Sequence, residues 1–258
     1  MRNSAKGEEG RRCVFCGDVA ASNEHVWPLW IGEVIRERLG VGSWIANRDG
    51  RERRVPKLDA KVKRVCEPCN TRWMSALEGK AKPLLTPMMF AEHRQFRLSP
   101  ADQRTLATWA FKTALMANFF HGDLPVSDLT YKGFYRDKLP PRHCTIWTTG
   151  YSGPKQRLTT DARAREFSGL GAYSRDGIFV ADPGRIVGAQ ITLIAVWVVF
   201  QVLIYEGYHV PFGTTASPLQ RIWPVDRTTI GWPPKTQGLS DLGVERLFDR
   251  RDVLRIVK

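Results

Sequence analysis

The sequence predicts an α+β protein in two parts, residues 1–85 and residues 86–258. Two Cys-x-x-Cys pairs in the first part bracket a helical pattern and a hairpin pattern, which predicts a small ββα unit held together by zinc. In the second part, one long helical pattern is followed by several strand patterns, which predicts an α+β domain of unknown type and role. No internal repeat and no low-complexity tract interrupts this order.

The first part contains a knuckle, a helix and a strand pattern in succession. Residues 13–17 predict a zinc knuckle that Gly17 closes, because glycine tolerates the positive φ that such turns often need. Residues 27–39 place apolar side chains at helical spacing and therefore predict a helix. Residues 43–66 predict a hairpin, with a turn at residues 47–50 and alternation along its last strand.

A short helix is expected to close the first part. It follows Asn70 in the stretch TRWMSALEGKAK, and we expect Pro83 to terminate it because proline lacks the N–H that a helix interior requires. Strand, hairpin and helix would then surround the metal.

The second part opens with a helix at Ser99-Pro100, where serine caps and proline suits the first helical position. One broad apolar stripe follows, formed by Leu106, Trp109, Ala110, Thr113, Met116, Ala117 and Phe120. Strands are expected at Cys144–Thr149, Leu170–Tyr173, Ile178–Ala181 and Ile191–Tyr205, the last with a bulge or break near Trp197. The tail is expected to be extended and to end in a short helix near Val244–Asp249.

Composition and charge narrow the class of partner. The 258 residues carry a net charge of +13, which indicates a polyanionic partner, most often nucleic acid; the alternative is a merely basic soluble surface. The most apolar run, Ile191–Tyr205, is shorter than the roughly 20 residues that a membrane span needs, so we expect no membrane partner. The N-terminus shows no secretory signal, and five cysteines without one indicate reduced thiols in the cytoplasm.

Four of the cysteines have the spacing of a metal site rather than of disulfides. Cys13, Cys16, Cys66 and Cys69 form two Cys-x-x-Cys pairs, whereas Cys144 stands alone. A structural zinc ion takes four protein ligands in a closed tetrahedron. The sequence therefore predicts one structural zinc with no open position.

A second set of polar residues accompanies the zinc ligands. Glu24 offers the hard oxygens that Mg²⁺ or Mn²⁺ prefers, and His25 can act as a general base near neutral pH. Adjacent residues of a regular strand point to opposite faces, so a shared site requires a twist or a strand end at this step. Pro28, three residues after His25, makes an irregular strand end plausible.

Taken together, Cys-x-x-Cys, acid-His and Cys-x-x-Cys-Asn resemble the HNH (His-Me finger) endonucleases over residues 13–85. The similarity is to the zinc-bound subgroup that includes a phage Holliday-junction resolvase and some restriction enzymes. It implies that Glu24 and Asn70 hold the catalytic divalent metal, Mg²⁺ or Mn²⁺, and that His25 activates the attacking water. The final histidine of the family has no counterpart here, and Glu78 is the substitute that we name. Glu24 also replaces the commoner aspartate.

The inserted hairpin is basic and fits a nucleic-acid partner. Ten Lys or Arg and four Asp or Glu residues lie between Arg36 and Arg64, and Lys and Arg side chains bind phosphates without reading sequence. The alternative is a solvated hairpin edge that charge protects from aggregation. The candidate nucleic-acid contacts are Arg51, Arg53, Arg54, Lys57, Lys61, Lys63 and Arg64 on or beside the hairpin, with Arg72 on the following helix.

These observations favour a metal-dependent endonuclease that hydrolyses phosphodiester bonds in DNA. A non-catalytic zinc-ribbon protein that binds nucleic acid is the alternative from a different class, and an RNase would use the same chemistry. A zinc-dependent base deaminase is excluded, because such an enzyme needs a His-x-Glu step and His25 is followed by Val26-Trp27. The oligomeric state stays open.

Overall fold

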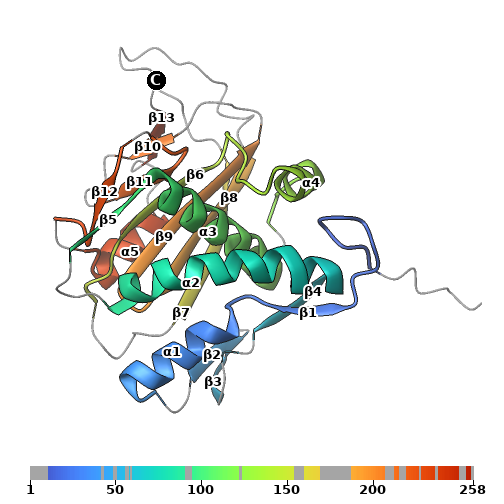
Figure 1. The fold of residues 1–258 in the computed structure, drawn as a ribbon, viewed down its shortest axis with the longest axis horizontal. Coiled ribbons are helices and arrows are strands. Elements are labelled where there is room, and N and C mark those ends of the chain that lie inside the picture. Colours follow the sequence, from blue (N-terminus) through green and yellow to red (C-terminus); the bar gives the residue numbers. More distant parts are fainter. Residues whose placement is uncertain are drawn as a thin grey trace, which may run out of the picture.

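A five-stranded antiparallel sheet with the order β11-β6-β9-β8-β7 occupies the centre of the computed structural model (Figure 1). Its strands are β11 (Gln220–Trp223), β6 (Thr145–Gly150), β9 (Val198–Glu206), β8 (Val187–Ala195) and β7 (Thr160–Ser168). The structure describes residues 11–41, 44–48, 51–55, 58, 60–90, 95–121, 124–153, 160–168, 187–206, 212–214, 219–226, 228–235, 238–249 and 254–256.

The long apolar run forms two strands of this sheet rather than one. β8 and β9 pair antiparallel from Val187↔Glu206 to Ala195↔Val198, and the chain reverses at Val196, whose φ is 54°. The predicted break near Trp197 is thus confirmed. The run is apolar along almost its whole length because both strands lie inside the sheet, where both of their faces are buried.

Helix α3 (Pro100–His121) packs against the sheet and connects it with the first part of the chain. Ser99 caps it as predicted: the Ser99 Oγ accepts from the Asp102 N–H at 3.2 Å, and the Asp102 carboxylate accepts from the Ser99 N–H at 2.9 Å. Every side chain from residue 106 to residue 118 is buried, so the helix is enclosed on all sides rather than along one stripe. Phe120, expected in the stripe, is 40% exposed.

Helix α2 (Ser75–Phe90) corrects the expectation that Pro83 ends the helix that follows Asn70. Pro83 and Pro87 both lie inside α2, which packs against α3 (Figure 1). Each proline removes one helical hydrogen bond, and its ring disturbs the preceding turn. Leu85, Met88 and Met89, beyond Pro83, are fully buried, and this burial favours continuation of the helix over the local preference.

The first part of the chain contributes a two-stranded ribbon beside α2 and α3. β1 (Ser22–His25) pairs antiparallel with β4 (Lys61–Val65), and α1 (Leu29–Leu39) follows β1. A hairpin is present as β2 (Trp44–Arg48) and β3 (Arg51–Val55), which pair from Trp44↔Val55 to Arg48↔Arg51. It ends earlier than predicted, because the strand expected at residues 60–66 is β4, which pairs with β1 instead. Residues 49 and 50 of the predicted turn lie outside the described residues.

Further elements complete the second part. Helix α4 (Asp128–Asp137) was not predicted, although Ser127 caps it. The extended tail contains β12 (Ile230–Trp232), which pairs with β5 (Phe96–Leu98), and β13 (Leu254–Ile256), which pairs with β10 (Phe212–Thr214). The predicted final helix is confirmed as α5 (Asp241–Asp249), and the predicted first strand is confirmed as β6. The predicted strands Leu170–Tyr173 and Ile178–Ala181 lie outside the described residues.

One apolar core runs through both parts of the chain. It includes Ile31 and Val65 from the first part and Trp109 and Phe200 from the second, and the predicted domain boundary at residue 85 falls within α2. Among the described residues, no helix has both the length and the apolar character needed to cross a bilayer.

Candidate metal centre and active site

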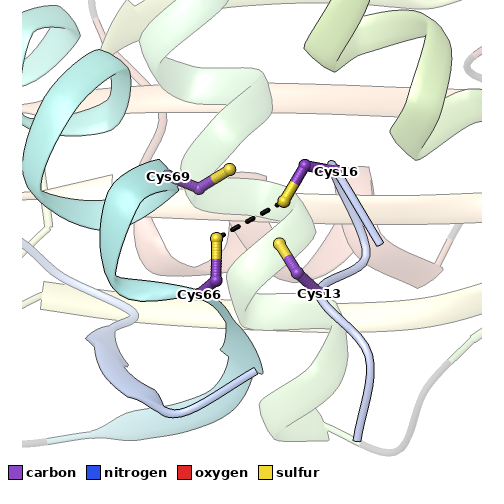
Figure 2. A group of neighbouring side chains, drawn as sticks. All are labelled: Cys13, Cys16, Cys66 and Cys69. Atoms are coloured by element: carbon purple, nitrogen blue, oxygen red, sulfur yellow. Dashed lines mark hydrogen bonds between the residues drawn. The ribbon is translucent and has the colours of Figure 1, made fainter. Parts of the chain in front are cut away.

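The four paired cysteines converge on one point, as Figure 2 shows. Their Sγ atoms all lie within 4.8 Å of one another, and those of Cys16 and Cys66 are 3.4 Å apart. Four thiolates at such separations can hold a metal ion such as zinc in a closed tetrahedral site. Cys144 is also buried but does not belong to this cluster.

The first pair of thiols is positioned by a tight backbone turn. The Gly17 N–H donates to the Cys13 carbonyl at 2.9 Å, and the Cys13 N–H donates to the Asp18 carbonyl at 2.6 Å. Gly17 has φ +86°, which confirms the expected positive φ at the end of the knuckle. The Val14 N–H donates to the Arg64 carbonyl at 3.1 Å, so the turn is attached to β4.

The second pair of thiols lies where β4 meets the helical segment. A π-helical turn, Cys69–Met74, leads directly into α2, and the Asn70 N–H donates to the Cys66 carbonyl at 3.1 Å. π-turns are rare and occur frequently at functional sites. This turn fixes the direction in which Cys69 and Asn70 leave the backbone.

Burial and hydrogen bonds shift the pKa values of the clustered thiols in different directions. Burial raises the pKa of Cys69 to about 11 and raises the pKa of Cys16 still further. Burial also acts on Cys13, but backbone hydrogen bonds from Cys16, Cys66 and Phe15 outweigh it and leave the pKa of Cys13 lowered. A metal ion must therefore displace protons from Cys16 and Cys69 at neutral pH.

Aromatic side chains pack beside the cysteine cluster. The Trp73 side chain lies close enough to Cys69 to lower the pKa of that thiol, while its indole nitrogen is buried without an ordinary hydrogen bond. Trp73 packs edge-on against Phe15 at a centroid distance of 5.1 Å, and the Lys138 ammonium lies 4.6 Å from its ring centroid. Such a layer limits the access of water to the sulfur atoms.

Glu24 and His25 lie at the end of β1 and face different sides of the ribbon. The register pairs Glu24 with Val62, which is buried, and His25 with Lys61, which is exposed. Directly paired residues share a face, so the regular alternation holds at this step. The register shift instead lies one step earlier, between Ser22 and Glu24. His25 is the last residue of β1 and is half-buried.

Lys112 joins Glu24 to Glu78, a contact that the sequence alone did not reveal. The Lys112 ammonium, on α3, donates to Glu24 Oε1 at 3.1 Å and to Glu78 Oε1 at 2.6 Å. Burial raises the pKa of Glu24 although Lys112 opposes it; burial lowers the pKa of Lys112, but the two carboxylates outweigh it and raise that pKa overall. The signal available in the sequence was a lone lysine inside an apolar helical stripe.

Asn70 is attached to the same strand as Glu24. Its Nδ2 donates to the Ser22 Oγ at 2.7 Å, and Ser22 precedes Glu24 by two residues on β1. Because the donor of the amide is used by Ser22, its oxygen points elsewhere and can accept or coordinate. The structure therefore joins Glu24 and Glu78 through Lys112, and it ties Asn70 to β1 through Ser22.

Of the residues predicted to contact nucleic acid, those that the structure describes lie on β3, on β4 and on the π-turn. Arg51, Arg53 and Arg54 lie on β3, while Lys57 and the side chains of the β3 arginines fall outside the described part. Lys61, Lys63 and Arg72 are exposed. Arg64 is half-buried and lies over the Phe119 ring, 4.7 Å from its centroid.

A pocket of about 290 Å³ brings further cations together. It lies between α2, α3 and the end of α4, and its lining includes Trp73, Lys80, Arg104 and Lys138. The three cationic residues are exposed, so an anion can reach them.

Comparison with protein-family models, with curated proteins and with solved structures finds no match for this chain. The functional interpretation therefore rests on the motif residues and on their geometry.

Proposed function

We propose that this protein is a metal-dependent endonuclease of the HNH (His-Me finger) type that hydrolyses phosphodiester bonds in DNA. The observation that carries the proposal is the convergence of two carboxylates, Glu24 from β1 and Glu78 from α2, on a single cation, in a segment that also holds a four-cysteine cluster. β1, β4 and α2 would form the ββα unit, with a structural zinc at its base. The zinc has no open position, so it stabilises the unit without taking part in hydrolysis.

The donor set suits Mg²⁺ or Mn²⁺. Glu24 and Glu78 already share one positively charged group, the Lys112 ammonium, which is the observation that supports a cation at this position. Carboxylate and amide oxygens are the ligands that these hard ions prefer. Glu24, Glu78 and Asn70 would hold the ion.

The roles of the residues follow from their chemistry. A bound divalent ion would neutralise charge that develops on the phosphate and the leaving oxygen. His25, at the end of β1, would accept the proton of the attacking water. His25 lies on the Lys61 face of the ribbon and Glu24 on the Val62 face, so the proposal requires that the end of β1 let both side chains reach one phosphate. The basic residues on and beside β3 would bind backbone phosphates, which gives affinity without sequence information.

The test is cleavage of plasmid, branched and single-stranded DNA, and of RNA, with Mg²⁺ or Mn²⁺. His25→Ala should lower the cleavage rate by about 10²–10⁴-fold, the usual contribution of a positioned general base, with unchanged zinc content and nucleic-acid affinity. His143→Ala is the matched control, because His143 contacts Tyr205 in the second part of the chain. Equal cleavage by wild type and His25→Ala would refute the role of His25.

A non-catalytic nucleic-acid-binding protein is the second candidate. The ion pairs of Lys112 favour it, since they give Glu24 and Glu78 a cationic partner without any metal. This candidate requires that folded, zinc-loaded protein bind nucleic acid and cleave none of the substrates above. Cleavage of RNA alone would instead identify an RNase.

A further inference from the structure

Lys112 lies deeper in the molecule than the two carboxylates that it contacts. Its side chain is 0% exposed, whereas those of Glu24 and Glu78 are 6% and 22% exposed. It reaches the site from the middle of α3, the helix that also packs on the central sheet. A divalent ion that enters from solvent would therefore meet the carboxylates before it met the ammonium.

The charges at this site are unbalanced. One ammonium faces two carboxylates, and it bonds only the Oε1 atom of each. Within the part of the chain that the structure describes, the second oxygens of Glu24 and Glu78 form no hydrogen bond. A buried charge is costly without a partner, so the ammonium keeps the two carboxylates together. One positive charge does not neutralise two carboxylates, and the second oxygen of each remains available to another cation.

We propose that Lys112 is the internal cation of this site: it holds Glu24 and Glu78 side by side when no divalent ion is present, and it competes with the ion for the same carboxylates. The inference rests on the proposed function in one respect, that Glu24 and Glu78 are ligands of a divalent metal. Lys112 is buried and does not reach substrate, so it acts through the carboxylates as a positioning residue.

Two opposing effects decide what the loss of Lys112 does. Loss of an outer residue that orients metal ligands typically weakens metal binding about 10–100-fold. A unit positive charge about 5 Å from a divalent ion, at an effective dielectric of about 20, weakens binding by well over a hundredfold. The charge effect is larger, so removal of the ammonium should strengthen metal binding.

The experiment compares wild type with Lys112→Met in the zinc-loaded full-length chain, with Mn²⁺ alone as the probe. Free Mn²⁺ is followed by electron paramagnetic resonance, and thermal unfolding is measured with and without the ion. We expect Lys112→Met to melt at a lower temperature than wild type, to bind Mn²⁺ at least about tenfold more tightly, and to regain most of the lost melting temperature on addition of Mn²⁺.

Leu115→Ala is the matched control for lost stability. Leu115 is fully buried on the same helix, and its truncation leaves a cavity but frees no carboxylate. Mn²⁺ should not restore its melting temperature. If Mn²⁺ restores both variants equally, or binds Lys112→Met no more tightly than wild type, the inference is overturned.

A second variant covers the case in which Lys112→Met does not fold. Glu78→Gln leaves Lys112 paired one to one with Glu24, and it should bind Mn²⁺ at least about tenfold more weakly than wild type. An unchanged Mn²⁺ affinity would mean that Glu78 is not a metal ligand, and it would overturn the inference. None of these measurements involves cleavage, so a protein without nuclease activity can still satisfy them, and an active nuclease can fail them.

Discussion

Asn70 links the cysteine cluster to the strand that carries Glu24. It follows Cys69 directly, its backbone N–H bonds the Cys66 carbonyl, and its side chain bonds Ser22 on the strand that carries Glu24. Two roles are possible for the side chain: it can fix β1 relative to the π-turn, or it can coordinate the metal through its oxygen. The two roles predict different consequences of substitution.

Asn70→Ala and Ser22→Ala both remove the hydrogen bond between Nδ2 and Oγ. If the side chain only fixes β1, the two variants should lose stability and cleavage alike, with a cost of about 0.5–1.5 kcal/mol in the free energy of unfolding. If Asn70 is a metal ligand, Asn70→Ala should lose at least about tenfold more cleavage than Ser22→Ala and need more Mg²⁺. We expect the second outcome. A metal titration of the cleavage rate decides it, and matching titration curves would contradict the ligand role.

At the scale of elements, the first part of the chain and the start of α3 show which structural features the sequence predicts. Local signals predicted the knuckle at Gly17, the helix at residues 27–39 and the cap at Ser99, because each depends on nearby backbone geometry alone. The predicted end of α2 at Pro83 is wrong, because the burial of Leu85 and Met88 outweighs the local effect of proline. That burial depends on tertiary packing and cannot be seen in a short stretch of sequence.

In the candidate site too, local spacing is predictable and contacts made by tertiary packing are not. The spacing of the cysteines predicted a cluster, and all four thiols converge. Lys112 is separated from Glu24 by 88 residues and was missed, because only the packing of α3 brings it to the carboxylates. The sequence predicts the break near Trp197 but not that β8 pairs with β9. The run is apolar throughout, so it has no alternation of apolar and polar residues from which the register could be predicted.

The cysteine cluster should release its metal as the pH falls. Cys16 and Cys69 have raised pKa values, that of Cys69 being about 11, so both are protonated at neutral pH without metal and lose a proton when zinc binds. The apparent affinity for zinc should therefore fall by about two logarithmic units for each unit decrease in pH, from these two thiols alone. Competition with a chromophoric chelator at pH 6.5, 7.0 and 7.5 measures the slope. A slope near zero would contradict a site in which these thiols are ligands.

Loss of the metal should unfold more than the knuckle. The cluster attaches residues 13–17 to β4 and to the π-turn that precedes α2. Structural zinc in small modules contributes apparent binding energies of about 10–16 kcal/mol. Cys66→Ser should therefore lose bound zinc and disorder β1 together with β4, as followed by hydrogen exchange of the β1 amides. Cys144→Ser is the control, because Cys144 lies outside the cluster and should keep one zinc per chain.

At the scale of the whole molecule, the net charge of +13 is distributed over both parts of the chain, so charge alone does not identify the surface that binds nucleic acid. The proposed function assigns it to the hairpin β2–β3 and its neighbours. Three arginines of the hairpin, Arg51, Arg53 and Arg54, can be compared with three exposed cations elsewhere in the chain, Arg97, Arg142 and Lys235. These two sets differ in position but not in charge, which makes them a matched pair.

Neutralising Arg51, Arg53 and Arg54 together should weaken binding to all DNA sequences alike. The logarithm of the affinity falls with the logarithm of salt concentration by roughly one unit of slope for each phosphate contact, so loss of three contacts should flatten the slope by about three. The Arg97, Arg142 and Lys235 triple variant makes the same change in net charge and should leave the slope unchanged, since only direct phosphate contacts release counterions. The measurement is fluorescence anisotropy with labelled duplexes of two unrelated sequences between 50 and 200 mM salt. An equal loss of slope in both variants would mean that the positive charge acts through the whole surface, and that the hairpin is only a charged edge.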